Sequence, residues 1–252
     1  KTGGSAQTGL IMTNILLFVV LPYACMAIFL IGSIYRYVNK GFTVSSISSQ
    51  FLEGKKLFWG SQPFHWGLLF LFFGHLIAFL FPRAVVAWNG QPIRLLILEV
   101  SSFAFGLCAL IGIVLLVSRR ITSKRVQMVT SKMDVVVYLI LLTKIISGLM
   151  VAYYSRWGSS WFAAFLTPYL KSIFVFNPQI DAVASVNSLS LTVHIISAFL
   201  IIGIIPFTRF IHFLVYPVDY IWRSYQQVIW NWDRRNIRTS RFWKRGKPFK
   251  NN

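Results

Sequence analysis

The sequence is poor in charged residues and especially in acidic ones. Only 12% of its residues are charged, with 6 Asp and Glu against 25 Lys and Arg, whereas soluble domains carry about 25% charged residues. It contains no paired carboxylates, phosphate-binding loop or Ser/His/Asp arrangement, which argues against a hydrolase. The two cysteines, Cys25 and Cys108, lie far apart in apolar stretches, and no C-x-x-C-H run is present. We therefore expect neither a structural disulfide nor covalent haem attachment.

Apolar residues, by contrast, make up 56% of the chain. They fall in blocks of about 20 residues, the length that crosses the hydrocarbon core of a bilayer as a helix. The net charge of +19 does not indicate a nucleic-acid partner, because the basic residues flank these blocks. We predict an all-α integral membrane bundle of five transmembrane helices, at residues 10–33, 64–81, 95–117, 134–154 and 189–213.

The basic residues predict an orientation in the membrane. Of the 25 Lys and Arg, 19 lie in segments 34–63 and 118–133 or from Arg209 onward, and five lie on the other side. Because basic loops stay in the cytoplasm, we expect a multi-pass protein of the cytoplasmic membrane with its N-terminus outside and its C-terminus inside. The expected division is an outer leader (1–9), the membrane domain (10–226) and a basic cytoplasmic tail (227–252).

All four histidines lie in or at the ends of two predicted spans: His65 and His75 in the second, His194 and His212 in the fifth. Ionisable residues within a membrane usually have a function and a partner, and imidazole is a common axial ligand of haem iron. Because the two helices run in opposite directions, His75 and His194 share the outer depth, and His65 and His212 share the inner depth. We therefore predict two b-type haems, each held by two histidines.

The axial spacing of these histidines is uneven. If each of the two spans were one continuous helix, His194 and His212 would lie about 27 Å apart and His65 and His75 about 15 Å apart. We expect helix tilt and a bend at Pro206 to absorb the difference between these spacings.

Several stretches then resemble a known family, the gamma subunit (dihaem cytochrome b) of membrane-bound respiratory nitrate reductases. They are FLIGSIYRY (29–37), SSQFL (48–52), PFHWG (63–67), FFGHL (72–76), SRRITSKRV (118–126) and FTRFIHFLVYPVDY (207–220). The resemblance implies the same haem pairs: His75 with His194 outside, and His65 with His212 inside. It also implies that a quinol is oxidised near the outer haem. Electrons then reach an iron–sulfur beta subunit and a molybdenum alpha subunit on the cytoplasmic face.

The chain departs from that family near the expected quinol site. The family places a lysine in the second outer loop, but here the nearest cation is Arg94, and Ala78 replaces a glycine. We expect any quinol to bind beside Gly74, His75 and Arg94. One alternative is the same dihaem scaffold in a nitrite-oxidising or other respiratory complex, with another donor or reversed electron flow. An alternative of a different class is a haem-free transporter or membrane anchor.

Three other basic residues are candidates for contacts with haem propionates. Lys144 lies mid-span, where it could snorkel to an interface or pair with a propionate. Arg119 and Arg120 could touch a propionate or a partner subunit, or serve only as positive-inside charges. Four glycines could leave room for porphyrin planes or simply allow close helix packing: Gly67, Gly74, Gly148 and Gly203. The basic, tryptophan-containing tail is expected to dock the cytoplasmic subunits or to bind anionic lipid.

Overall fold

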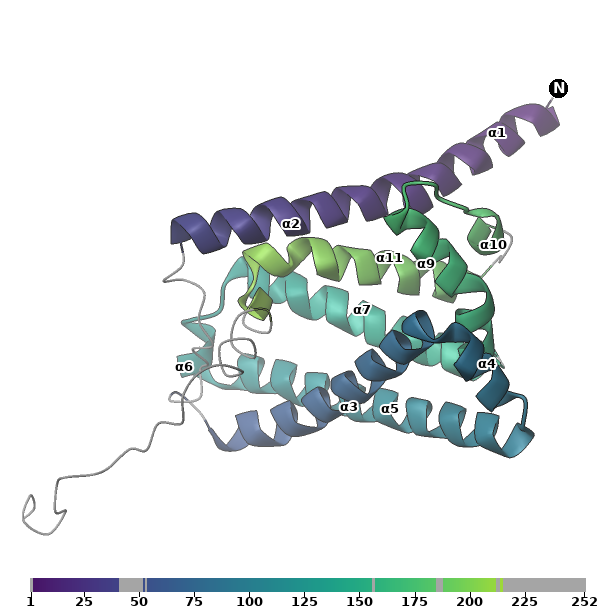
Figure 1. The fold of residues 1–252 in the computed structure, drawn as a ribbon. Helices are drawn as coiled ribbons and strands as arrows, with labels where there is room; N and C mark the ends of the chain where they lie inside the picture. Colours follow the sequence, from purple (N-terminus) through teal and green to yellow (C-terminus); the bar gives the residue numbers. More distant parts are fainter. Residues whose placement is uncertain are drawn as a thin grey trace, which may run out of the picture. The chain divides into compact units, whose positions relative to one another are not determined.

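The computed structural model describes residues 2–40, 52, 54–155, 157–184, 188–211 and 214. All of them belong to one compact unit, formed by residues 1–215, and every regular element among them is helical. Five helical segments are long and apolar enough to cross a membrane: Thr8–Asn39, Lys55–Leu80, Pro92–Thr122, Lys132–Tyr154 and Leu189–Phe207. The predicted all-α fold with five spans is therefore confirmed (Figure 1). The predicted tail at 227–252 lies outside the described residues.

The first span is built from two helices joined by a π-helical turn. Helix α1 (Thr2–Ile15) continues through the turn η1 (Leu16–Val20) into α2 (Leu21–Lys40). The residues expected to form an outer leader are thus already helical from Thr2. Tyr169 contacts this turn from α9 (Thr167–Phe174): its hydroxyl donates to the carbonyl of Phe18 at 2.7 Å.

The remaining spans are α3 (Lys55–Leu80), α5 (Pro92–Thr122), α7 (Lys132–Tyr154) and α11 (Leu189–Ile204). Local sequence explains where they begin. Proline occupies the first position of α5, where no backbone donor is needed. Ser131 and Asp134 form a capping box at the start of α7. Ser188 accepts a hydrogen bond from the backbone of Leu191 at the start of α11.

Short helices connect these spans. They are α4 (Pro82–Asn89), α6 (Lys124–Gln127), α8 (Gly158–Trp161), the π turn η4 (Phe162–Leu166), α9 (Thr167–Phe174) and α10 (Asp181–Ala184). The connection from α7 to α11 packs over the C-terminal end of α3, where Thr167 donates a hydrogen bond to the carbonyl of Ala78 at 3.3 Å.

Small residues set how closely the helices approach. Helix α3 crosses α5 obliquely (Figure 1), and a Cβ at Gly67 or Gly112 would collide with the backbone of the other helix. Helix α5 also packs on α7, while α11 packs on α7 and α2. The histidine-bearing helices α3 and α11 are not one of these closely packed pairs.

Two helix boundaries differ from the sequence-based prediction. Helix α3 begins at Lys55 rather than at residue 64, because it continues through Pro63, as transmembrane helices often do. Helix α11 ends at Ile204, and the chain turns at Pro206 into two short 3₁₀ turns, η5 (Ile205–Phe207) and η6 (Arg209–Ile211). The expected bend at Pro206 is therefore present. The assumption of one continuous helix from residue 189 to 213, which gave the 27 Å spacing, is wrong.

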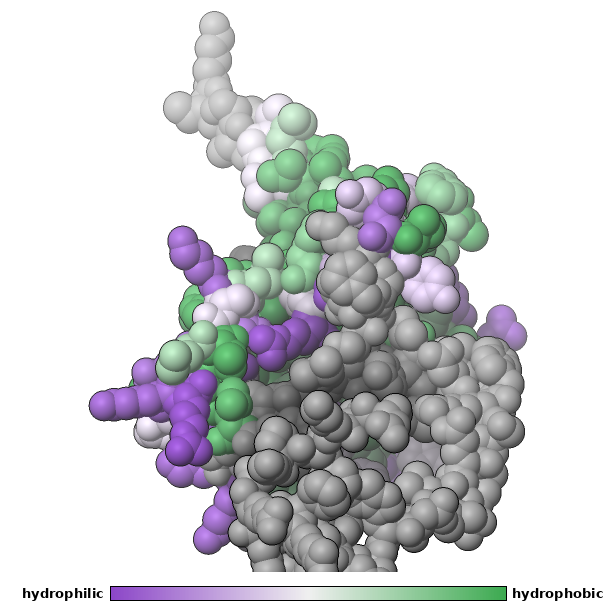
Figure 2. All heavy atoms as spheres, turned by 90° about the vertical axis from the view of Figure 1, so that its left-hand side faces the viewer, coloured by the Kyte–Doolittle hydropathy of each residue, from purple (hydrophilic) through white to green (hydrophobic). Residues whose placement is uncertain are grey.

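The basic segments gather at one end of the bundle. The end of α2, the start of α3, the short helix α6 and the end of α11 all lie at that end (Figure 1). Figure 2, which looks at this end, shows hydrophilic side chains on its described part and hydrophobic side chains along the flank. The described parts of segments 34–63 and 118–133 and the end of α11 are therefore close together in space.

Candidate functional site

The structure brings together the two histidines predicted to share the outer depth. The ring centroids of His75, on α3, and His194, on α11, lie 6.5 Å apart, and their planes are inclined by 37°. An imidazole nitrogen lies about 2 Å from a metal that it binds, so two rings on opposite sides of one iron have centroids roughly 6 Å apart. The observed separation fits a pair of axial ligands.

The same ring nitrogen, Nδ1, faces a main-chain carbonyl in each of the three described histidines. Nδ1 of His65, His75 and His194 lies 2.8, 2.7 and 3.0 Å from the carbonyl oxygens of Ser61, Leu71 and Lys144, respectively. A carbonyl only accepts, so each Nδ1 carries the hydrogen and the lone pair is on Nε2. Histidines that bind metals typically donate their other ring N–H to a carbonyl or carboxylate in this way. The donor set therefore fits axial ligation of haem iron.

Helix α7 positions the imidazole of His194. The hydroxyl of Ser147 lies 3.3 Å from Nδ1, beside the Lys144 carbonyl that accepts from the same nitrogen. Gly148 lies against the ring, because a Cβ there would come within 2.6 Å of Cε1 of His194. A larger residue at Gly148 would push the ring from this place, so a glycine is required for this approach.

Lys144 makes a contact that the sequence did not suggest. Its Nζ lies 2.8 Å from Nε2 of His194 and 3.2 Å from the carbonyl oxygen of the same residue. The side chain thus turns toward a candidate iron ligand rather than snorkelling to an interface. Its predicted contact with a haem propionate stays a prediction.

The four glycines considered from the sequence fall into three groups. Gly67 and Gly203 serve close helix packing, against the backbone of α5 and against Cys25 on α2. Gly148 instead makes room for the ring of His194. Only at Gly74, next to His75, would an added Cβ meet nothing within 4 Å. Space beside the candidate ligand is therefore available at Gly74 alone among the four.

The aromatic ring of Phe162, in η4, lies edge-on to His75, with ring centroids 5.0 Å apart. The connection between α7 and α11 thus covers one side of the outer pair. Neither Phe162 nor Ser147 was singled out from the sequence. An aromatic residue and a serine near apolar segments carry no signal of their own before the helices are placed.

The inner pair is described only in part. His65 has its ring against Phe64, with centroids 5.5 Å apart, and Nδ1 is also 3.0 Å from the hydroxyl of Ser61. His212 lies outside the described residues. The segment leading to it is held by Arg36 of α2, whose guanidinium donates to the carbonyls of Pro206 and Thr208 at 2.6 and 2.8 Å.

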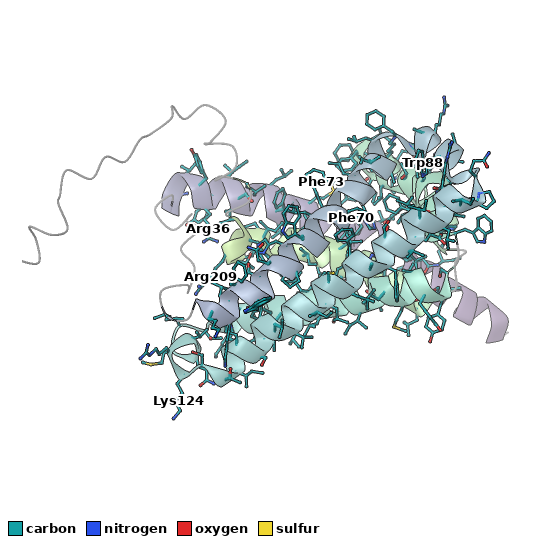
Figure 3. All side chains as sticks on the ribbon, turned by 90° about the horizontal axis from the view of Figure 1, so that it is seen from below. Arg36, Phe70, Phe73, Trp88, Lys124 and Arg209 are labelled. Carbon is teal, nitrogen blue, oxygen red and sulfur yellow. The ribbon has the colours of Figure 1, made fainter. Side chains whose placement is uncertain are left out.

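An aspartate at the basic end holds the same segment from another side. Asp134 accepts from Arg120 at 3.1 Å and pairs with Arg209 at 3.7 Å. Figure 3 shows Arg36 and Arg209 at the end of the bundle away from Trp88. The guanidinium of Arg120 also lies over the ring of Tyr138, 5.3 Å from its centroid.

Arg120 is therefore engaged within this chain, and its predicted propionate contact, like that of Arg119, stays a prediction. Arg119 is buried.

Arg94 is placed at the opposite end, at the start of α5. Its guanidinium lies over the ring of Trp88, 5.0 Å from the centroid. Within the described residues, no hydrogen bond or ring contact joins Arg94 to His75 or Gly74. The quinol site proposed from these three residues is thus not assembled by direct contacts between them.

Comparison with known proteins decides the family. A family model described as nitrate reductase gamma subunit matches residues 14–231. The chain belongs to this family. This gamma subunit is 32% identical over 217 residues to the nitrate reductase gamma chain of Bacillus subtilis, covering 85% of our chain and 97% of that protein. It is also 32% identical over 223 residues to the respiratory nitrate reductase 1 gamma chain of Escherichia coli, covering 85% and 96%.

The resemblance found from the sequence motifs is thereby confirmed. The protein is a multi-pass membrane subunit of the nitrate reductase type, which associates with other subunits of an oxidoreductase complex.

Proposed function

We propose that this gamma subunit binds two b haems, an outer one between His75 and His194 and an inner one between His65 and His212. The observation that carries the proposal is the outer pair itself: two imidazoles from different helices, 6.5 Å apart, each with Nδ1 bonded to a carbonyl. His65 repeats that hydrogen bond at the inner position. When bound, the haems supply one-electron transfer across the membrane.

The protein's part is to hold and orient the iron ligands. The carbonyls of Leu71 and Lys144 fix which nitrogen of each outer histidine faces the pair. Phe162 covers His75 from one side, and Gly148 lets α7 approach His194. These contacts define the ligand orientation before any metal enters, which lowers the entropy cost of binding.

The redox partners of the complex are proposed to dock on the basic end of the bundle. This end carries Arg120, Arg209 and the short basic helix α6, and it is the one that the positive-inside rule assigns to the cytoplasm. We assign the iron–sulfur beta subunit and the molybdenum alpha subunit to this face. The N-terminus then lies outside.

The electron donor is proposed to be a quinol that binds on the outer side, near His75. The open space at Gly74 supports this position, and Arg94 at the start of α5 is the candidate cation for a quinol oxygen. Arginine does not release its proton in the physiological range, so Arg94 can orient such an oxygen but cannot accept its proton.

The test is an optical redox titration of the purified complex combined with single histidine substitutions. We expect two b-type components. His75→Ala and His194→Ala should each remove one of them, and His65→Ala and His212→Ala should each remove the other. A complex without haem would support the transporter or anchor alternative. Loss of the same component from His65→Ala and His194→Ala would show that the pairing is wrong.

A further inference from the structure

Lys144 and His194 contact each other twice, through the main chain and through the side chain of Lys144. The carbonyl of Lys144 accepts from Nδ1 of His194 at 3.0 Å. The side-chain Nζ lies 2.8 Å from Nε2, the other ring nitrogen, and 3.2 Å from the carbonyl oxygen of His194. One residue therefore both orients the imidazole and occupies its second nitrogen.

The contact of Nζ with Nε2 and the binding of a metal to Nε2 exclude each other. A neutral imidazole has one nitrogen lone pair available in the ring plane. Because Nδ1 donates its hydrogen to a carbonyl, that lone pair is on Nε2. It can accept a hydrogen bond from Lys144 or bind iron, but it cannot do both.

We propose that the side chain of Lys144 competes with haem iron for Nε2 of His194 and so weakens haem binding at the outer site. This inference rests on the proposed function, since it requires haem at that site. Haem binding at this site then requires the amine of Lys144 to leave Nε2. The carbonyl oxygen of His194, at 3.2 Å, is a partner that it can keep.

Of the three described histidines, His194 alone has such a competing contact at Nε2. Within the described part of the chain, Nε2 of His65 and Nε2 of His75 have no hydrogen-bond partner, although the Nδ1 atoms of both rings are bonded. His75 is also exposed, whereas His194 is partly buried. The structure thus distinguishes two ligands that the sequence treats as equivalent.

Substitution separates the two roles of Lys144, because the orienting bond comes from its backbone. Lys144→Met keeps the carbonyl that fixes Nδ1 and removes the amine that occupies Nε2. Breaking the hydrogen bond from the Lys144 amine is then no longer part of haem binding, which predicts a dissociation constant for the outer site about tenfold lower. Lys144→Leu should show the same gain with a shorter side chain.

The experiment uses the full chain from haem-limited cells, in lipid nanodiscs, titrated with haemin. A His65→Ala background restricts binding to the outer site, and the low-spin signal of two axial histidines in electron paramagnetic resonance identifies it. Lys171→Met is the matched control: it removes another lysine near the outer end, one that lies over the ring of Phe79 at 5.7 Å.

Tighter binding in both Lys144→Met and Lys144→Leu, with Lys171→Met unchanged, is the expected result. Unchanged or weaker haem binding in the Lys144 variants would overturn the proposed competition. Weaker binding would instead make Lys144 a supporting contact of the haem. Failure of the wild-type chain to take up haem would be distinct, because it would overturn the proposed function itself.

Discussion

Gly148 of α7 lies against the imidazole of His194 of α11 so closely that a Cβ at position 148 would come within 2.6 Å of Cε1 and 3.0 Å of Nδ1. Real side chains do not approach to such distances, and the main chain of α7 cannot move aside without breaking its packing on α5 and α11. The ring of His194 must therefore shift in any variant that adds a side chain here.

We predict that Gly148→Ala weakens or abolishes the outer haem component while the inner one stays. The physical reason is that a shifted ring no longer keeps the present separation of 6.5 Å from the ring of His75. The measurement is the optical redox titration of the purified complex. Gly158→Ala is the control, because nothing lies within 4 Å of a Cβ there. An outer component with unchanged amplitude and potential in Gly148→Ala would contradict this account.

A second prediction concerns Asp134, which joins three segments of the basic end. Its partner Arg120 is nearly as buried as Asp134 itself, at 14% and 13% side-chain exposure, whereas Arg209 is 51% exposed. Most of the stabilisation should therefore come from the Arg120 pair, since exposed ion pairs contribute little. Asp134→Asn should lower the free energy of unfolding by about 2 kcal/mol, the scale of a hydrogen bond to a charged group.

The Arg209 pair should matter for position rather than for stability. Arg209 precedes His212 by three residues, so Asp134→Asn is also expected to broaden or shift the inner haem component. Thermal unfolding in detergent and the redox titration measure the two effects. Asp181→Asn, an exposed aspartate on α10, serves as control. An inner component unaffected by Asp134→Asn would show that the pair of Asp134 and Arg209 does not position the segment that leads to His212.

The sequence predicted the fold well where the length of an apolar stretch determines the structure. It predicted less well the contacts between side chains of different helices. All five spans were found, because an apolar stretch of about 20 residues has few other stable environments. The match between His75 and His194 followed from helix direction and depth. The end of α11 near Pro206 could be located only roughly, because a proline can bend a membrane helix or end it.

The partners of Lys144 could not have been predicted in the same way. A mid-span lysine can reach an interface, an acidic group or a neighbouring helix, and which it contacts depends on how α7 and α11 pack. The requirement for glycine at 148 has the same origin: it depends on a ring from a helix about 50 residues away.

A third prediction uses the hydroxyl of Tyr169, which donates to the carbonyl of Phe18 in the π turn. Burial raises the pKa of Tyr169 above its ordinary value, with a smaller contribution from Tyr23. The neutral phenol is thus favoured in the folded chain. Its contribution to stability is complete below about pH 10, the pKa of an unfolded tyrosine, and is lost as the pH rises toward the folded pKa.

Tyr169→Phe should lower stability near neutral pH by about 1 to 2 kcal/mol, because the carbonyl of Phe18 loses its donor. Above about pH 10 the variant should lose stability less steeply than the wild type, since it has no phenol to ionise at this position. Thermal unfolding midpoints across this range test both effects. Tyr153→Phe, at an exposed position, is the matched control. Parallel pH profiles for wild type and Tyr169→Phe would be inconsistent with this role.

The last prediction concerns the donor and depends on the pair formed by Arg94 and Trp88. The guanidinium lies 5.0 Å from the ring centroid of an exposed tryptophan, so its position is restrained without its hydrogen-bond donors being used by the ring. A quinol oxygen that reaches the outer end can accept from those donors. Removing one charged donor is typically equivalent to about a tenfold loss in binding or rate.

We therefore expect Arg94→Ala to slow reduction of the outer haem by menaquinol or ubiquinol analogues about tenfold, with the redox potential of that haem unchanged. Trp88→Leu should give a smaller decrease, because Arg94 keeps its charge but loses its restraint. Arg83→Ala, which removes an arginine from the preceding helix α4, should have no effect. Rapid reduction in Arg94→Ala would exclude Arg94 from the quinol site. If no quinol reduces the wild-type complex, the donor is of another class and electrons enter this scaffold from a different partner.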